Sequence, residues 1–171
     1  MRKTPETILA LDPGLRDLGY AVLTGRRLAA SGVLNLRDTP RSQRISVASG
    51  HVRRWVAVHR PSAVVVEKTH PHSLPWLDRL HRLTLRVRRI ARGHRADFAL
   101  YAPQTVRKSL VGNGRAKKPE VAIAVAHRFP QLRVHLTQDR RWKERYWQNM
   151  FDAVALAIHH QRLQHPPSRG R

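Results

Sequence analysis

The stretch "ILALDPGLRDLGYAVL", residues 8–23, decides how this chain folds. An apolar run ends at Asp12, a Pro-Gly pair and a short polar loop follow, and a second apolar run begins near Gly19. Short apolar runs separated by a glycine-containing loop predict two antiparallel strands. The carboxylate stands out, because the chain has 33 Lys and Arg residues but only 11 Asp and Glu residues. Asp12 is therefore the first candidate functional residue.

The composition bounds the class of protein. The chain has 171 residues, 41% of them hydrophobic, which suits a core of one domain. We expect a single domain over residues 1–164 and a disordered basic tail over 165–171. No apolar run approaches the roughly 20 residues of a membrane helix. The absence of cysteine excludes a disulfide framework and a thiolate site, and it fits a cytoplasmic location.

The charge indicates the kind of partner. A formal net charge of +22 favours a polyanion, and nucleic acid is the leading candidate because its phosphates carry most of the non-specific affinity. A ribosome-associated protein, or one that is merely rich in arginine, is the alternative.

The remaining patterns predict an α/β fold with a mixed five-stranded sheet flanked by helices. An antiparallel meander forms its first part, and parallel strands follow. The expected strands are 7–12, 18–24, 27–36, 61–68 and 96–103. The expected helices are 41–59, 74–92, 104–110, 119–129 and 145–163.

Three carboxylates end or interrupt apolar elements. Asp12 and Glu67 close two strands that we expect to be neighbours, and Asp152 lies on the apolar face of the last helix. Taken singly, they can be a turn residue, an ordinary charge at a strand end and an ion-pair partner of an arginine. Together they indicate an oxygen-ligand site for Mg²⁺ or Mn²⁺. Two such ions could activate a water and stabilise the leaving oxygen of a phosphodiester.

Four motifs in order resemble the RuvC family of Holliday-junction resolvases, whose fold is RNase H-like. They are "LALDPGLRDLGYAVL" (9–23), "AVVVEK" (63–68), "YAPQTVRKSLVGNGRAKKPEVAIAV" (101–125) and "DAVALAIHH" (152–160). The resemblance implies a metal-dependent endonuclease of DNA recombination and repair. It would act as a homodimer that nicks four-way DNA junctions symmetrically, near the nucleoid, with a branch-migration motor as a further candidate partner.

The resemblance also implies a set of metal ligands. Asp12 would bind both of two ions, and Glu67 and Asp152 would bind one each. The family's fourth ligand, usually acidic and sometimes histidine, is Asn149 here, and its amide lacks the charge. His159, two turns after Asp152, is an alternative fourth ligand. Its other candidate roles are capping the helix and contacting DNA.

Basic residues complete the expected site. Arg107 and Lys118 match family lysines near the scissile phosphate and are candidate catalytic residues. The predicted DNA-binding residues are Trp76, Arg79, Arg82, Arg86, Arg89, Lys108, Gly112, Gly114, Arg115 and Lys117. Trp76 is either a wedge into the junction or an apolar anchor. The apolar stripe of helix 74–92 packs on the sheet or on a second subunit, and its arginine face contacts DNA or solvent.

The sequence therefore predicts a junction-resolving nuclease. Two alternatives stay open at this point. One is an RNase H-like nuclease that acts on RNA or on other branched DNA. The other is a non-catalytic junction- or RNA-binding protein whose metal site is weakened by Asn149.

Overall fold

Five strands form one mixed sheet in the computed structural model, which describes residues 5–14, 16–69, 75–136 and 141–166. The strands are β1 (Thr7–Pro13), β2 (Asp17–Thr24), β3 (Arg27–Asn35), β4 (Ala63–Glu67) and β5 (Asp97–Tyr101). Their order across the sheet is β3-β2-β1-β4-β5. The first three are antiparallel, and β4 and β5 run parallel to β1. This confirms the predicted meander with added parallel strands.

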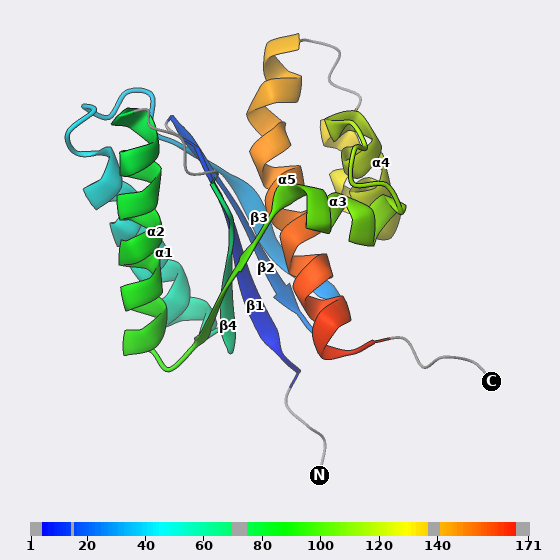
Figure 1. Cartoon of the computed structure of the whole chain (residues 1–171), viewed down its shortest axis with the longest axis horizontal. Coiled ribbons are helices and arrows are strands. Elements are labelled where there is room, and N and C mark those ends of the chain that lie inside the picture. Colours follow the sequence, from blue (N-terminus) through cyan, green and yellow to red (C-terminus); the bar gives the residue numbers. More distant parts are fainter. Residues whose placement is uncertain (1–4, 15, 70–74, 137–140, 167–171) are drawn as a thin grey trace.

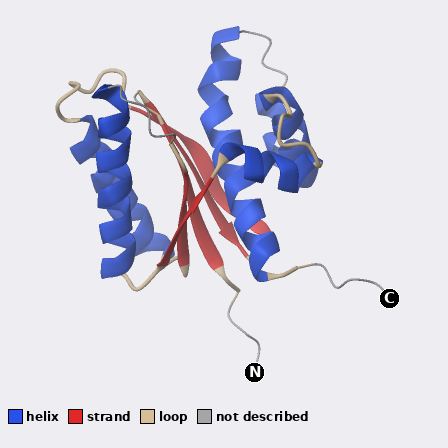
Figure 2. Cartoon of the chain, viewed as in Figure 1, coloured by secondary structure: helices blue, strands red, loops and turns tan. Residues whose placement is uncertain are grey.

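Helices cover both faces of the sheet (Figures 1 and 2). Two of them, α1 (Arg44–His59) and α2 (Pro75–Gly93), pack on one face. The other face carries α3 (Pro103–Val111), α4 (Lys118–Arg128), the short 3₁₀ helix η1 (Pro130–His135) and α5 (Arg141–Gln164). None of the described helices is long and apolar enough to cross a bilayer.

Two helix starts differ from the sequence expectation by three or more residues, and the other boundaries agree within two. Helix α1 begins at Arg44 rather than near residue 41, because the chain first makes a turn in which the Gln43 amide donates to the Pro40 carbonyl at 2.8 Å. Helix α5 begins at Arg141, four residues earlier than expected. Most of the expected basic tail, residues 167–171, lies outside the described residues.

The alternation of side chains along the strands divides the core into two layers. Along β1, Ile8 and Ala10 join the cluster under α5, whereas Leu9 and Leu11 join the cluster under α1 and α2. Successive side chains of a strand point to opposite faces. Asp12, the next residue of β1, therefore points to the α5 face.

Gly19 sets how closely α5 approaches the sheet. It pairs with Asp12 across β1 and β2. A Cβ built at Gly19 would lie 2.0 Å from the backbone oxygen of Asn149 and 2.3 Å from its carbonyl carbon. Because no side chain fits in that space, glycine lets the α5 backbone rest directly on β2. The same contact brings Asn149 and its helical neighbour Asp152 to the end of β1.

We expect Gly19→Ala to destabilise the protein by about 1–3 kcal/mol, because α5 must move away from the sheet. Gly50→Ala is the matched control: among the described residues, a Cβ at Gly50 in α1 would meet no atom within 4 Å beyond its own helix backbone. That substitution should stabilise by about 0.5–1 kcal/mol, the usual gain in a helix interior. Urea unfolding measures both, and a Gly19→Ala protein as stable as the wild type would contradict the contact.

Candidate active site

Two parallel strands place Asp12 and Glu67 side by side. Leu11 pairs with Val66 in the register of β1 and β4, so Asp12 and Glu67 occupy the next position of each strand. Val65 belongs to the cluster under α5, and Glu67 is two residues further along the same strand. Both carboxylates therefore lie at the carboxyl end of the sheet and on its α5 face, where open α/β sheets bind their ligands.

Helix α5 supplies the third carboxylate. It packs across β1 and β2, and its residues from Met150 to Ile158 are almost entirely buried. Asp152 lies within this stretch and is only 9% exposed, and Asp12 is 8% exposed. The three carboxylates predicted from the sequence thus converge on one end of the sheet from three different elements.

Burial disfavours the ionised forms of all three carboxylates, and repulsion by neighbouring carboxylates adds to this at Asp12 and Glu67. Desolvation raises the pKa of Asp12 well above its ordinary value, and the charges of Glu67 and Asp152 raise it further. Desolvation, with the charge of Asp152, raises the pKa of Glu67 to about 7. The pKa of Asp152 is also raised, chiefly by burial. A positive charge close to the three carboxylates would therefore stabilise their ionised forms.

Lys118 and Gln148 stabilise the ionised form of Asp152 and lower its pKa. The Lys118 ammonium lies 3.5 Å from one carboxylate oxygen, and the Gln148 amide donates to the other at 2.9 Å. The charge of Arg107 lowers the pKa of both Glu67 and Asp152, which places its guanidinium within electrostatic reach of the site. Lys118 and Arg107 are predicted from the sequence, but Gln148 is missed there, although Gln and Asp four residues apart on a helix are a known pair.

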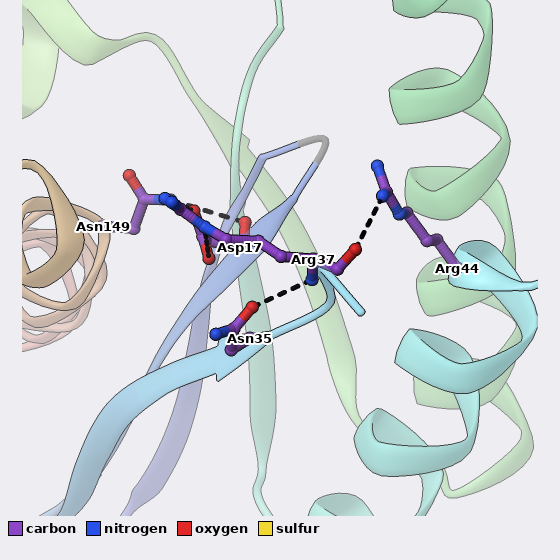
Figure 3. A network of polar contacts seen from close by, with 5 residues as sticks. All are labelled: Asp17, Asn35, Arg37, Arg44 and Asn149. Atoms are coloured by element: carbon purple, nitrogen blue, oxygen red, sulfur yellow. Dashed lines mark hydrogen bonds and ion pairs between the residues drawn. The ribbon is translucent and has the colours of Figure 1, made fainter. Parts of the chain in front are cut away.

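Asn149 lies over the loop between β1 and β2 (Figure 3). Its amide nitrogen donates to the Asp17 carbonyl at 3.4 Å, and the Gly14 amide donates to the same oxygen at 2.9 Å. The Asp17 carboxylate is in turn paired with Arg37 at 2.9 Å. With the amide nitrogen engaged, the side-chain oxygen of Asn149 is the atom left for a cation. Its role as fourth ligand stays a prediction.

His159 neither caps a helix nor contacts DNA, the two roles that the sequence suggested as alternatives to metal binding. It is 3% exposed, so it neither contacts DNA nor caps the helix, which continues to Gln164. Its ring packs edge-on against Tyr101 at 4.7 Å, and neither ring nitrogen has a hydrogen-bond partner among the described residues. The neighbouring His160 accepts or donates a 2.7 Å hydrogen bond with the Tyr101 hydroxyl. Burial lowers the pKa of both histidines, so they are neutral parts of the core.

Three of the four arginines expected on helix α2 lie on its outer side. Arg82, Arg86 and Arg89 are exposed, and Arg79 is half-buried. Arg82 pairs with Asp78 at 2.9 Å. The side chain of Trp76 lies outside the described residues. The apolar stripe of α2 is buried within this chain through Leu80, Leu83 and Val87, as the sheet-packing alternative predicted.

The basic loop between α3 and α4 owes its glycines to the fold. Gly112 ends α3 with a φ of 77°, a left-handed conformation that favours glycine. A Cβ at Gly114 would lie 3.1 Å from the Gln104 carbonyl oxygen. Exposed cations lie on either side of these glycines, namely Lys108, Arg115 and Lys117. Their contact with DNA stays a prediction.

The site does not yet have the shape of a closed metal centre. In the part of the chain that the structure describes, no three Asp, Glu, His or Cys side chains converge closely enough to hold an ion as they stand. Lys118 instead places its ammonium beside Asp152. The donor chemistry fits a hard divalent cation, because the buried groups are carboxylate oxygens with an amide oxygen nearby.

Comparisons of sequence and of structure lead to one family. The family model described as crossover junction endodeoxyribonuclease RuvC matches residues 8–160. The RuvC crossover junction endodeoxyribonuclease of Rhodopseudomonas palustris strain TIE-1 is 30% identical over 92% of this chain and 88% of its own length. Thermus thermophilus RuvC is 25% identical with a TM-score of 0.69, covering 91% of this chain and 93% of that one. The T. thermophilus RuvC complex with a Holliday junction substrate has a TM-score of 0.74 at 24% identity, with the same coverage.

We expect Glu67→Gln to stabilise the metal-free protein at pH 8 and to change its stability little near pH 4.5. A carboxyl whose pKa is raised in the folded state contributes stability below its unfolded pKa, and that contribution is lost as the pH rises through about 7. At about 1.4 kcal/mol per pKa unit, we expect a gain of about 1–3 kcal/mol at pH 8.

Urea unfolding in a chelating buffer, compared at the two pH values, measures this difference. The control is Asp38→Asn, which removes an exposed acid elsewhere. A Glu67→Gln effect that is equal at both pH values would show that Glu67 is not held in a desolvated, acid-lined site.

Proposed function

The chain belongs to the RuvC family of crossover junction endodeoxyribonucleases, and on that premise we propose that it resolves four-way DNA junctions by hydrolysing one phosphodiester bond in each of two strands. The observation that carries the proposal is the convergence of two buried carboxylates, from β1 and α5, with the partly buried Glu67 of β4, in a chain of net charge +22. Buried acids of this kind suit a divalent cation, and the charge around them suits a phosphate backbone.

Mg²⁺ or Mn²⁺ is the cofactor that the donor set supports, with two ions in each site. Asp12 would contact both, Glu67 and Asp152 one each, and the Asn149 oxygen would complete the set. When bound, the cations supply an activated water and charge stabilisation at the leaving oxygen. The raised pKa values of Asp12 and Asp152 favour this assignment, because a bound cation would offset the burial that disfavours both ionised carboxylates and the repulsion that adds to it at Asp12.

The remaining side chains of the site orient a carboxylate or supply positive charge. Gln148 fixes the orientation of Asp152 through its 2.9 Å hydrogen bond. Lys118 is 55% exposed, so its ammonium can turn from Asp152 toward a phosphate oxygen that enters the site. Arg107 adds a second cation near the same carboxylates. Both cations would stabilise charge that develops on the phosphate in the transition state. No described side chain is needed as a covalent nucleophile in this scheme.

The assembly follows from the substrate. A four-way junction has two strands to cut, and a two-fold symmetric homodimer would present one site to each. We also retain a branch-migration motor as a candidate partner and a cytoplasmic location at the nucleoid. Leu85 on α2 is exposed, whereas the apolar stripe of the same helix is buried in this chain's own core.

We expect Asp12→Asn to lower the rate of junction cleavage at least about a thousandfold, because a metal ion contributes several kcal/mol to such a reaction. The matched control, Asp97→Asn, removes an exposed acid at the opposite end of the sheet and should cleave like the wild type. The assay uses labelled four-way junction, linear duplex and structured RNA, each with Mg²⁺ and with Mn²⁺.

Each outcome of that assay decides between functions. Junction binding without cleavage in either metal would make the chain a non-catalytic binding protein. Cleavage of RNA alone would assign it to RNA, and equal cleavage of linear duplex would remove the specificity for branched DNA. Full activity of Asp12→Asn would show that the reaction occurs elsewhere.

We expect Asn149→Asp to lower the Mg²⁺ concentration for half-maximal cleavage several-fold, because a fourth carboxylate adds charge to the ligand set. Asn149→Ala, which removes the oxygen, should raise that concentration. Titration of Mg²⁺ in the cleavage assay measures both. If neither variant changes the Mg²⁺ dependence, Asn149 serves only to hold the loop through Asp17.

A further inference from the structure

A cavity of about 490 Å³ lies between α1, α2 and the turn that follows β1. Gly14 forms part of its wall, and five arginines from four separate segments line it. They are Arg16, Arg37, Arg41, Arg44 and Arg79. Of these, only Arg79 was expected to contact DNA. We call this hollow the five-arginine cavity.

The positive charge of the cavity is not balanced by its walls. None of the described residues that line it is acidic. Asp17, just outside, pairs with Arg37 at 2.9 Å. Arg44 donates to the carbonyl oxygens of Thr39 and Arg37 at 3.0 and 3.2 Å, and these contacts position its side chain. Several guanidinium groups facing one hollow repel one another, and an anion inside would relieve that repulsion.

The chemistry of the lining selects a phosphate. Guanidinium groups bind phosphate oxygens through paired, charge-assisted hydrogen bonds. The apolar part of the wall, with Leu80 and Leu83 of α2, keeps part of the cavity free of competing polar groups. The volume falls in the range of ligand sites and exceeds the needs of a single phosphate, which leaves room for the sugars on either side.

The cavity opens at the same end of the sheet as the carboxylates. Gly14 lines the cavity and stands two residues after Asp12. A Cβ built at Gly14 would be 3.2 Å from the Asn149 amide nitrogen, so the turn separates the two places by very little. Figure 3 shows the same arrangement, with Asn149 on the α5 side, Arg44 on α1 and Asp17 and Arg37 between them. A nucleic-acid strand that crosses this end of the sheet can reach both places.

We propose that the five-arginine cavity binds a phosphodiester group of the same DNA whose scissile phosphate lies at the carboxylates. The inference rests on the proposed function for the identity of the DNA. It adds a second, metal-independent anchor on the opposite face of the sheet, which fixes the direction in which the strand leaves the site.

The test removes charge from the cavity with a matched control. The double variant R16Q/R41Q changes two exposed arginines of the cavity, and it leaves Arg37, which is bonded to Asp17, and Arg44 in place. The control, R26Q/R27Q, removes the same charge from the β2–β3 turn. This turn lies at the opposite end of the sheet, where β1 begins. Thermal unfolding checks that all variants are folded.

Binding of a fluorescent four-way junction is measured in EDTA over a range of salt concentrations. We expect R16Q/R41Q to reduce the slope of log affinity against log salt by about 1–2, since each phosphate contact contributes about 0.9. The control should reduce it by clearly less, and R16K/R41K should restore most of it. An equal change in R16Q/R41Q and R26Q/R27Q would overturn the proposal.

Two further measurements distinguish a free ion from DNA as the occupant of the cavity. Inorganic phosphate, exchanged for chloride at constant ionic strength, tests for a free ion. If it stabilises the wild type but not R16Q/R41Q, while DNA affinity is equal in both, the cavity binds free phosphate and the DNA assignment is overturned. Cleavage by the wild type with Mg²⁺ is scored on the same junction, so loss of the proposed function is recognised separately from failure of the cavity.

Discussion

The cost of burying Asp12 beside two other carboxylates is the constraint on which the rest of this structure depends. Asp12 is 8% exposed, and both burial and the charges of Glu67 and Asp152 disfavour its ionised form. An unpaired buried charge is among the most destabilising features a fold can contain. The fold offsets part of this cost because Asp12 lies at the carboxyl end of the sheet, where the charge of Lys118 lowers its pKa.

Close packing makes the convergence of the acids possible. Two carboxylates come from neighbouring parallel strands, so their spacing is fixed by the sheet. The third comes from a helix, and its position depends on how near that helix lies. Gly19 removes the side chain that would hold α5 away, and the Asn149 backbone occupies that space. The clustering of the three carboxylates therefore depends on the close contact between α5 and Gly19.

Much of this arrangement could be predicted from the sequence, and the exceptions share a physical reason. The strands, the helices and the three carboxylates are marked by local patterns, such as an apolar run that ends in an acid. The approach of α5 over Gly19 and the bond from Gln148 to Asp152 depend on register and on helix rotation, which local patterns do not encode. The five-arginine cavity draws on Arg16 and Arg79, which are far apart in the chain, so only the folded structure brings them together.

The few acids of this chain also show why the carboxylate end of the sheet needs a cation. Outside it, two acids are each paired with one arginine: Asp17 with Arg37, and Asp78 with Arg82. Glu120 accepts a hydrogen bond from the Lys117 amide at the start of α4. At the site, by contrast, three acids share one ion pair, with Lys118. The protein has three times as many basic as acidic residues, yet only one basic side chain forms an ion pair at this site. A divalent ion would balance the remaining negative charge.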